Sequence, residues 1–225
     1  MKARLLSCLA GLAALAAPGA ALAQDGRVQI KLMATGVLPD GKIKDIRSAT
    51  VALPDGTDTD ASDNWVPTAA IEYFFSDSLS VETICCLTSH HVNGAGAIAG
   101  VSHLVDDVLI LPATLTLKYH VPAGPIRPYV GAGPAYFIVL DSKVGAGGIA
   151  ALGAASADVK SKVGFALQAG VDIPLGQSGF GVSFDAKRYF VRPIARFEDA
   201  NGATLLETRH KLDPWVVSGG ISFRF

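Results

Sequence analysis

The chain has 225 residues, a formal net charge of −1 and only 17% charged residues, while half of its residues are hydrophobic. The near-neutral charge gives no sign of nucleic-acid binding. Beyond the N-terminal region, no stretch reaches the roughly 20 uninterrupted apolar residues that a spanning helix needs. A hydrophobic chain without helical spans can cross a bilayer as a closed β-barrel, because lipid cannot satisfy open backbone groups.

The N-terminus has the pattern of a secretory signal peptide. Two basic residues precede an apolar run from Leu5 to Ala17, and a small-x-small cleavage site, Ala21-Leu22-Ala23, follows it. The segment is short and lies at the extreme N-terminus, which favours a cleaved signal over a membrane helix. We therefore expect residues 1–23 to be removed and residues 24–225 to form one exported domain.

Eight segments of the mature chain alternate apolar and polar side chains with period two, which predicts strands. They run over about 28–38, 66–75, 79–89, 109–121, 126–141, 162–173, 180–191 and 215–225. In the fourth, apolar residues at the odd positions from Leu109 to Val121 oppose Thr114, Thr116, Lys118 and His120. The fifth is rich in Gly and Pro, and its facing is ambiguous.

Short and long connections alternate between these segments. Residues 76–78, 122–125 and 176–179 predict tight turns, whereas 39–65, 90–107, 142–161 and 192–212 are long. We interpret 39–63 as an exposed loop, and the Gly/Ala-rich stretch 142–158 as a short helix or a flexible cover. Short periplasmic turns and long extracellular loops are typical of bacterial outer-membrane barrels. The sequence therefore predicts an all-β fold, an eight-stranded antiparallel transmembrane β-barrel in the bacterial outer membrane.

The last strand supports this location. From Trp215 to the terminal Phe225, every odd position is apolar or glycine, and the other face is mostly small or polar. A soluble edge strand this apolar would be prone to aggregation, so lipid is the favoured environment. We expect outer-membrane lipids as partners, and recognition of the Phe225 strand by the barrel-assembly machinery.

The size of the barrel limits what can pass through it. Eight strands leave an interior just wide enough for side chains or one small ligand, which argues against an open diffusion pore for sugars. Charged side chains near the periplasmic end are expected to pair as a plug, which we favour over a polar conduit. They are Glu72, Glu82, Lys118, Asp172 and Arg224. Candidates for an apolar pocket in the upper lumen are Met33, Leu38, Trp65, Phe137 and Phe190.

The remaining candidate groups carry weaker signals. His90, His91 and His103 could form a metal or pH-sensitive site, but their irregular spacing favours a solvated loop. Cys85 and Cys86 are adjacent in a strand and point to opposite faces, so a bond between them would require a distorted backbone. We interpret both as small, buried hydrophobic side chains. No metal ion or cofactor is implied.

Several stretches give the chain a family resemblance. It resembles the OmpW family of small outer-membrane proteins over essentially its whole mature length. The stretches that carry the resemblance are Ile71–Glu82, Leu111–His120, Ile126–Tyr136, Asp185–Tyr189 and the terminal strand. The resemblance implies a narrow, partly hydrophobic lumen that admits small apolar molecules, and a surface-receptor role in some members.

Two functions agree with these observations, and two others agree poorly. The first is passage of small hydrophobic molecules through the lumen, with lateral exit to lipid above the charged plug. The second is a structural barrel or surface receptor whose long loops bind phage, toxin or host. An apolar pocket would favour the first, and a fully packed lumen the second. We expect no enzymatic activity, since the adjacent residues Ser89, His90 and His91 point apart in a strand or loop and no Gly-x-Ser-x-Gly elbow occurs. A soluble lipocalin-like carrier is the weakest alternative, because it would not have an apolar outside.

Overall fold

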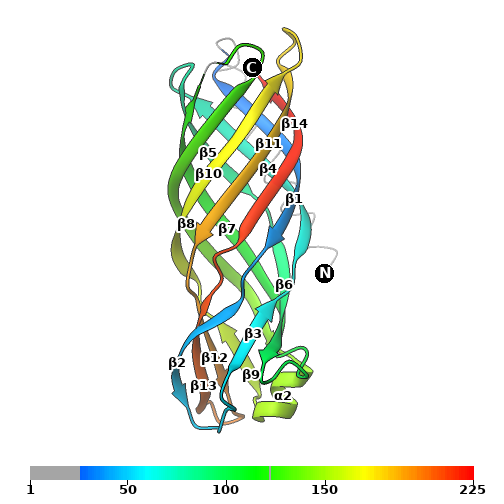
Figure 1. Ribbon diagram of the computed structural model, residues 1–225, viewed down its shortest axis with the longest axis vertical. Coiled ribbons are helices and arrows are strands. Elements are labelled where there is room, and N and C mark those ends of the chain that lie inside the picture. The colour runs from blue at the N-terminus through cyan, green and yellow to red at the C-terminus, as the bar shows by residue number, and fades with distance from the viewer. Residues whose placement is uncertain (1–25, 122) are drawn as a thin grey trace.

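The computed structural model describes residues 26–121 and 123–225 (Figure 1). The expected signal peptide and its cleavage site lie outside the described residues. Within the described part of the chain, no helix is long and apolar enough to cross a membrane.

Eight antiparallel strands form a closed barrel. Its spanning strands are β1 (Val28–Leu38), β4 (Asn64–Phe74), β5 (Leu79–Cys85) continued by β6 (Thr88–Gly96), β7 (Val105–His120), β8 (Arg127–Val144), β10 (Lys162–Pro174), β11 (Phe180–Phe190) and β14 (Trp215–Arg224). Each pairs with its neighbour around the ring, and β1 pairs with β14 to close it. The predicted fold is confirmed.

Alternation along the strands separates a lipid face from an interior. On β7, Leu115 and Leu117 are exposed on the outside, whereas Thr116 and Lys118 between them are buried inside. The structure also settles the facing of the fifth predicted strand. On β8, Tyr129 and Phe137 are buried, while Val130 and Tyr136 are exposed. The outer surface is therefore apolar and the interior contains most of the polar side chains.

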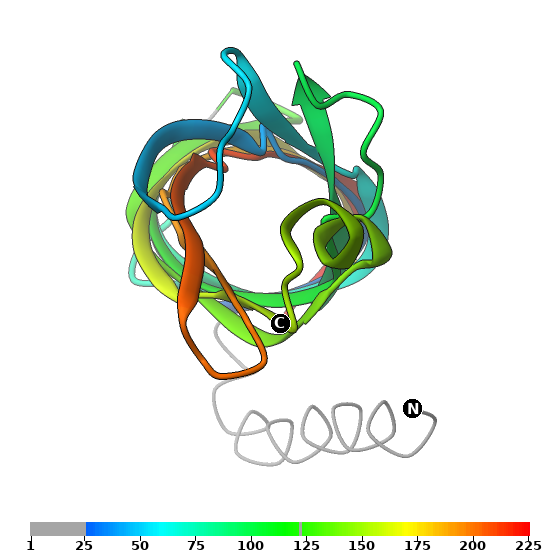
Figure 2. The ribbon, with the colours of Figure 1, turned by 90° about the horizontal axis from the view of Figure 1, so that it is seen from below.

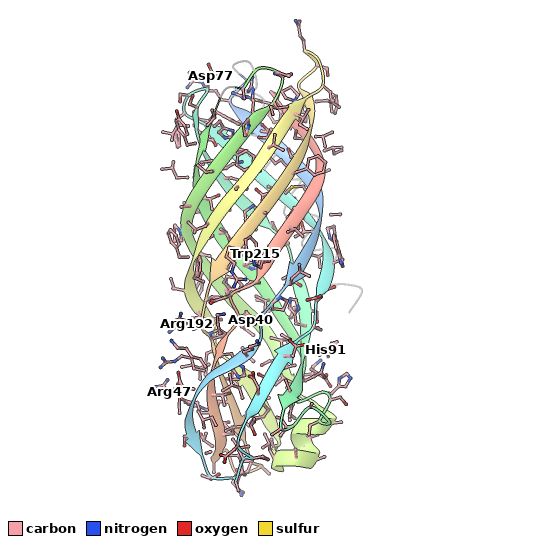
Figure 3. The ribbon with its side chains drawn as sticks, in the orientation of Figure 1. Asp40, Arg47, Asp77, His91, Arg192 and Trp215 are labelled. Atoms are coloured by element: carbon pink, nitrogen blue, oxygen red, sulfur yellow. The ribbon has the colours of Figure 1, made fainter. Side chains whose placement is uncertain are left out.

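The two ends of the barrel differ. The turn that contains Asp77 and the end of β14 lie at one end, which short turns identify as periplasmic (Figure 3). At the other end the long connections fold into a second sheet of β2 (Lys42–Ala49), β13 (Thr204–Lys211), β12 (Ile194–Glu198) and β9 (Ser156–Val159). β3 (Thr57–Ala61) extends this end by pairing with β6.

The prediction of an exposed loop over residues 39–63 was wrong, because this segment contains β2 and β3. Its strands gain partners and a covered face from distant segments, since β2 pairs with β13 and β3 with β6. The Gly/Ala-rich stretch forms the short helix α2 (Ala146–Leu152), which is one of the two expected alternatives. Seen along the axis, the strands form a ring and α2 lies over one side of its extracellular mouth (Figure 2).

Candidate functional site

An apolar cavity of about 250 Å³ lies beneath the extracellular sheet. Inward positions of β7, β12 and β13 form much of its wall, because alternate residues of these strands point to the axis. Aliphatic and aromatic side chains dominate the lining and include Leu53, Val92, Leu104, Val108, Phe197 and Leu206. The long connections therefore build the chamber that encloses this space.

His210 of β13 is a polar member of the cavity wall. Its Nε2 lies 2.7 Å from Thr208 Oγ1, and its Nδ1 lies 3.2 Å from both Thr59 Oγ1 and the Gly41 carbonyl oxygen. Burial lowers the pKa of His210, although the Gly41 carbonyl partly opposes this shift. The ring is therefore neutral near pH 7, and its nitrogens are engaged by the protein.

Below the large cavity the lumen narrows to a space of about 20 Å³. The two cavities share His90, Ile110, Phe137 and Leu212 in their walls, so they are neighbours. The rings of Phe137 and Tyr189 meet edge to face with centroids 5.2 Å apart. We call this constriction the neck.

A network of ion pairs fills the lumen on the periplasmic side of the neck. Lys118 Nζ lies 2.8 Å from Glu72 Oε2 and 2.9 Å from Glu82 Oε2. Lys31 Nζ lies 2.9 Å from Glu72 Oε2 and 3.1 Å from Asp172 Oδ1. The network thus joins side chains from strands on different sides of the barrel.

The same network extends toward the neck. Lys187 Nζ lies 2.6 Å from Asp185 Oδ1 and 3.1 Å from Glu82 Oε1. We call these side chains the charged plug; they are Lys31, Glu72, Glu82, Lys118, Asp172, Asp185 and Lys187. All seven are at most 6% exposed. Multiple partners for each charge offset the desolvation that burial of a charge costs.

Neutral polar groups complete the plug. Gln168 donates hydrogen bonds to Glu82 and Asp185, and the Tyr129 hydroxyl donates to Asp185. Lys118 Nζ lies 3.6 Å from the Tyr129 ring centroid, within reach of a cation–π interaction. Most polar atoms of the plug therefore already have protein partners, and few are free to bind water.

The barrel wall is interrupted at the level of the neck. No strand pairing covers Cys86 and Leu87, between β5 and β6. Continuing the β4–β5 register from Ala69↔Cys85 places Leu87 opposite Pro67. Continuing the β5–β7 register from Ile84↔Thr114 places Cys86 opposite Pro112, and β6 resumes in that register at Thr88↔Ile110. The third predicted strand, 79–89, is therefore broken because proline cannot donate to a ladder.

Comparison with known proteins identifies the family. The model of the OmpW family matches residues 24–225. The chain belongs to the OmpW family. An uncharacterized outer-membrane protein, y4mB of Sinorhizobium fredii, is 34% identical over 75% of this chain and 69% of its own length. The dibenzothiophene metabolism operon protein PahQ of Pseudomonas aeruginosa is 30% identical over 74% of both chains.

A solved structure supports the same architecture. The outer membrane protein OprG of Pseudomonas aeruginosa aligns with a TM-score of 0.76 over 89% of this chain and 96% of its own, at 24% identity. This likeness concerns the fold. Together with the family match it places this OmpW-family barrel in the outer membrane.

Of the five residues predicted to line a pocket in this OmpW-family chain, some face the lumen and the others face the outer surface of the barrel. Phe137 lines both cavities. Met33 is buried in the lumen with Ala70, Ile84 and Cys86, below the large cavity. Trp65 and Phe190 are 68% and 44% exposed on the outer surface, so their assignment to the lumen was wrong. Leu38 is half-buried and lines neither cavity, because even positions of β1 point outward.

Four of the five predicted plug residues meet in the OmpW-family lumen: Glu72, Glu82, Lys118 and Asp172. Arg224 lies instead at the periplasmic rim, where its Nε donates to the Gly26 carbonyl and its guanidinium covers the Phe74 ring. The sequence analysis did not assign Lys31, Asp185 or Lys187 to the plug, and it did not identify Gln168 and Tyr129 as the neutral partners of the plug. Alternation already placed Lys31 on the polar face of its strand, so that signal was available; Tyr129 lay in the ambiguous fifth strand.

The three predicted histidines and the two cysteines do not form one common site. The expected solvated loop was wrong for His90, which lies on β6 and is buried, with its ring in contact with the Ser62 carbonyl and Thr88. The rings of His91 and His103 stack with their centroids 5.2 Å apart. Within residues 26–121 and 123–225, no group of three or more His, Cys, Asp or Glu side chains is arranged to hold a metal ion. Both cysteines are free thiols, and Cys86 is buried as expected. The expectation was wrong for Cys85, which is exposed because alternation along β5 turns it to the outer face.

Proposed function

We propose that this barrel admits small hydrophobic molecules from the cell exterior and releases them sideways into the outer membrane. The apolar cavity ending on the charged plug carries this proposal. A solute that leaves water for the cavity gains from burial of its apolar surface. A fully packed lumen would instead have favoured a purely structural or receptor role.

The charged plug blocks onward passage to the periplasm. An apolar solute that reached the plug would have to separate buried ion pairs and leave their charges without partners. Removing one partner of such a pair costs about 3–5 kcal/mol, so this route is closed to a molecule that offers no hydrogen bonds in return.

The interruption at Cys86 and Leu87 offers a route through the wall. The neck cavity is lined by Cys86, Thr88 and Pro112, so it lies directly inside the interruption. Separating the strands here requires less free energy than in an intact wall, because each missing ladder hydrogen bond lowers that free energy by about 0.5–1.5 kcal/mol. The solute then enters the hydrocarbon layer.

Cavity size and relatives narrow the substrate class. An apolar cavity of roughly 150 Å³ holds benzene, so this larger cavity suits a molecule of about two or three fused aromatic rings, or a hydrocarbon of similar volume. The name of the 30% identical relative PahQ refers to dibenzothiophene metabolism. We therefore infer fused-ring aromatic hydrocarbons and their sulfur analogues as substrates.

The test measures solute uptake into vesicles whose membrane contains the refolded protein and whose outer leaflet is lipopolysaccharide. Naphthalene and dibenzothiophene are compared with a disaccharide, and empty vesicles give the background rate. Faster entry of the aromatic compounds alone supports the proposal. Fast entry of the disaccharide would indicate an open aqueous pore, and no enhancement of any solute by a folded barrel would favour the receptor role.

A further inference from the structure

The outer face of the extracellular sheet carries an excess of positive charge. Eight basic side chains lie on β2, β12, β13 and the adjoining end of β11, and we call them the basic face: Lys42, Lys44, Arg47, Arg188, Arg192, Arg196, Arg209 and Lys211. Five acidic side chains lie among them: Asp40, Asp45, Asp158, Glu198 and Glu207. The whole chain has a net charge of −1, so an excess of three positive charges here is a local concentration.

The carboxylates neutralise one half of the basic face. Lys211 Nζ lies 2.8 Å from Asp40 Oδ2, and Arg209 Nη1 lies 3.6 Å from Asp45 Oδ2. Glu207 serves two partners, with an oxygen 2.6 Å from Arg196 Nη2 and another 3.5 Å from Arg47 Nη1.

The other half has no carboxylate partner. Lys42, Lys44, Arg188 and Arg192 form no ion pair within 4.0 Å among the residues that the structure describes. Lys42 and Lys44 are exposed on either side of Ile43, which points into the apolar cavity. A β-bulge in the β2–β13 pairing at this point leaves Lys44 without an opposite residue. These four cations are therefore available to an external anion.

Their level relative to the membrane is fixed by aromatic side chains. Arg188 is opposite Trp215 in the β11–β14 pairing, and its guanidinium lies 5.3 Å from the Trp215 ring. Exposed Trp215 and Phe190 mark the extracellular interface, as aromatic belts do in barrels. Arg192 and Asp40 lie just beyond Trp215 on the extracellular side, and Arg47 lies further out (Figure 3). The cations thus begin at headgroup level.

The charges near the membrane are close enough to affect one another. The Lys211 hydrogen bond, with Lys42 and Arg188 nearby, lowers the pKa of Asp40. Asp40 forms its close ion pair with Lys211, whereas Lys42 and Arg188 act on it only from beyond 4.0 Å. The β3–β6 side of the same end offers no comparable surface, since β3 carries Asp58 and Asp60 and the adjacent β7 carries Asp106.

We propose that the basic face binds the phosphate groups of the glycolipid that forms the outer leaflet of the outer membrane. Arginine forms paired hydrogen bonds with phosphate oxygens, and lysine supplies point charges. Each basic side chain near an anionic lipid surface strengthens binding about fivefold. Such contacts anchor the extracellular sheet to the lipid on one side of the barrel, independently of what the cavity binds.

The test measures binding of lipid A to the refolded mature protein in zwitterionic micelles at about 150 mM salt, which screens surface charges beyond roughly 8 Å. The variant Lys42→Gln/Lys44→Gln/Arg192→Gln removes three unpaired cations. A charge-keeping variant, Lys42→Arg/Lys44→Arg/Arg192→Lys, and Lys143→Gln on another side of the extracellular end are the controls. The gel shift between unheated and heated samples confirms that each barrel is folded.

We expect the charge-removing variant to lose about a hundredfold in affinity, while both controls stay within threefold of the original protein. Lipid A without its phosphates should bind no more tightly than it does to the charge-removing variant. Unchanged affinity of that variant, or equal binding of the dephosphorylated lipid, would overturn the proposal. Equal binding of a phosphorylated sugar without acyl chains would indicate a general polyanion site and also overturn it.

Discussion

Pro67 of β4 and Pro112 of β7 face the same break in the barrel wall from opposite sides, one opposite Leu87 and the other opposite Cys86. Neither residue can donate a ladder hydrogen bond. Two neighbouring strands therefore both lack a donor where the third strand is interrupted, and this coincidence weakens the wall beside the neck.

Restoring the missing donors should slow lateral exit. We expect Pro67→Val/Pro112→Val to reduce dibenzothiophene uptake about thirtyfold, because two new ladder bonds of about 1 kcal/mol each must break before the wall opens. Pro134→Val is the matched control, since Pro134 is exposed on β8, away from the break. Uptake at the original rate by the folded double variant would show that solutes leave by another route.

Filling the cavity should block entry without weakening the barrel. Ala195 of β12 is 6% exposed and lines the large cavity, so Ala195→Phe places a ring where the solute would bind. We expect at least tenfold weaker naphthalene binding, measured by fluorescence of the ligand. Ala186→Phe adds the same volume to the lipid face of β11 and should leave binding unchanged. Equal binding by both variants would remove this cavity from the pathway.

Breaking the plug should destabilise the fold far more than breaking a surface pair. Lys118→Met leaves Glu72 and Glu82 short of a buried cation, and we expect a loss of about 3–5 kcal/mol in the free energy of unfolding, measured with urea. Lys143→Met breaks an exposed pair with Asp107 and should leave the urea midpoint unchanged. A small effect of Lys118→Met would mean that water reaches and solvates the plug.

Acidification should loosen the extracellular sheet through His210. Burial lowers the pKa of His210 in the folded state below the value of 6.5 in the unfolded state. The unfolded sheet therefore binds a proton first, and stability falls as the pH drops through 6.5 until the folded pKa is reached. We expect faster amide hydrogen exchange in β13 at pH 5 than at pH 7, after correction for the intrinsic rate.

His210→Gln should remove this pH dependence, whereas His103→Gln, which alters an exposed ring, should preserve it. Equal pH dependence in the original protein and the His210→Gln variant would assign the effect to another group.

The sequence predicted much of the barrel because lipid imposes a strict alternation. Thr114, Thr116 and Lys118 could be placed inside from their spacing alone, since a one-residue slip would expose a lysine to hydrocarbon. The facing of the strand predicted over about 126–141 stayed ambiguous, because its many Gly and Pro residues are neither clearly apolar nor clearly polar. Trp65 and Phe190 were misplaced because an aromatic residue near a strand end suits both an interface and a pocket.

The extracellular sheet could not be derived in the same way. β2 pairs with β13, more than 150 residues away along the chain, with two register shifts, and neither segment alternates cleanly by itself. Loop-like composition over 39–63 therefore concealed strands whose stability depends on a distant partner.

The sequence by itself determined the eight-stranded barrel and its polar interior, because both follow from local alternation under the constraint of a lipid solvent. The resemblance to the OmpW family rested on its motifs, and the family model confirmed it. Tertiary structure alone decided where Lys31, Lys118 and Lys187 meet their carboxylates, where two prolines face one break, and which loops enclose the cavity. Those features depend on which strands become neighbours around the ring, and that geometry is absent from any local stretch of the chain.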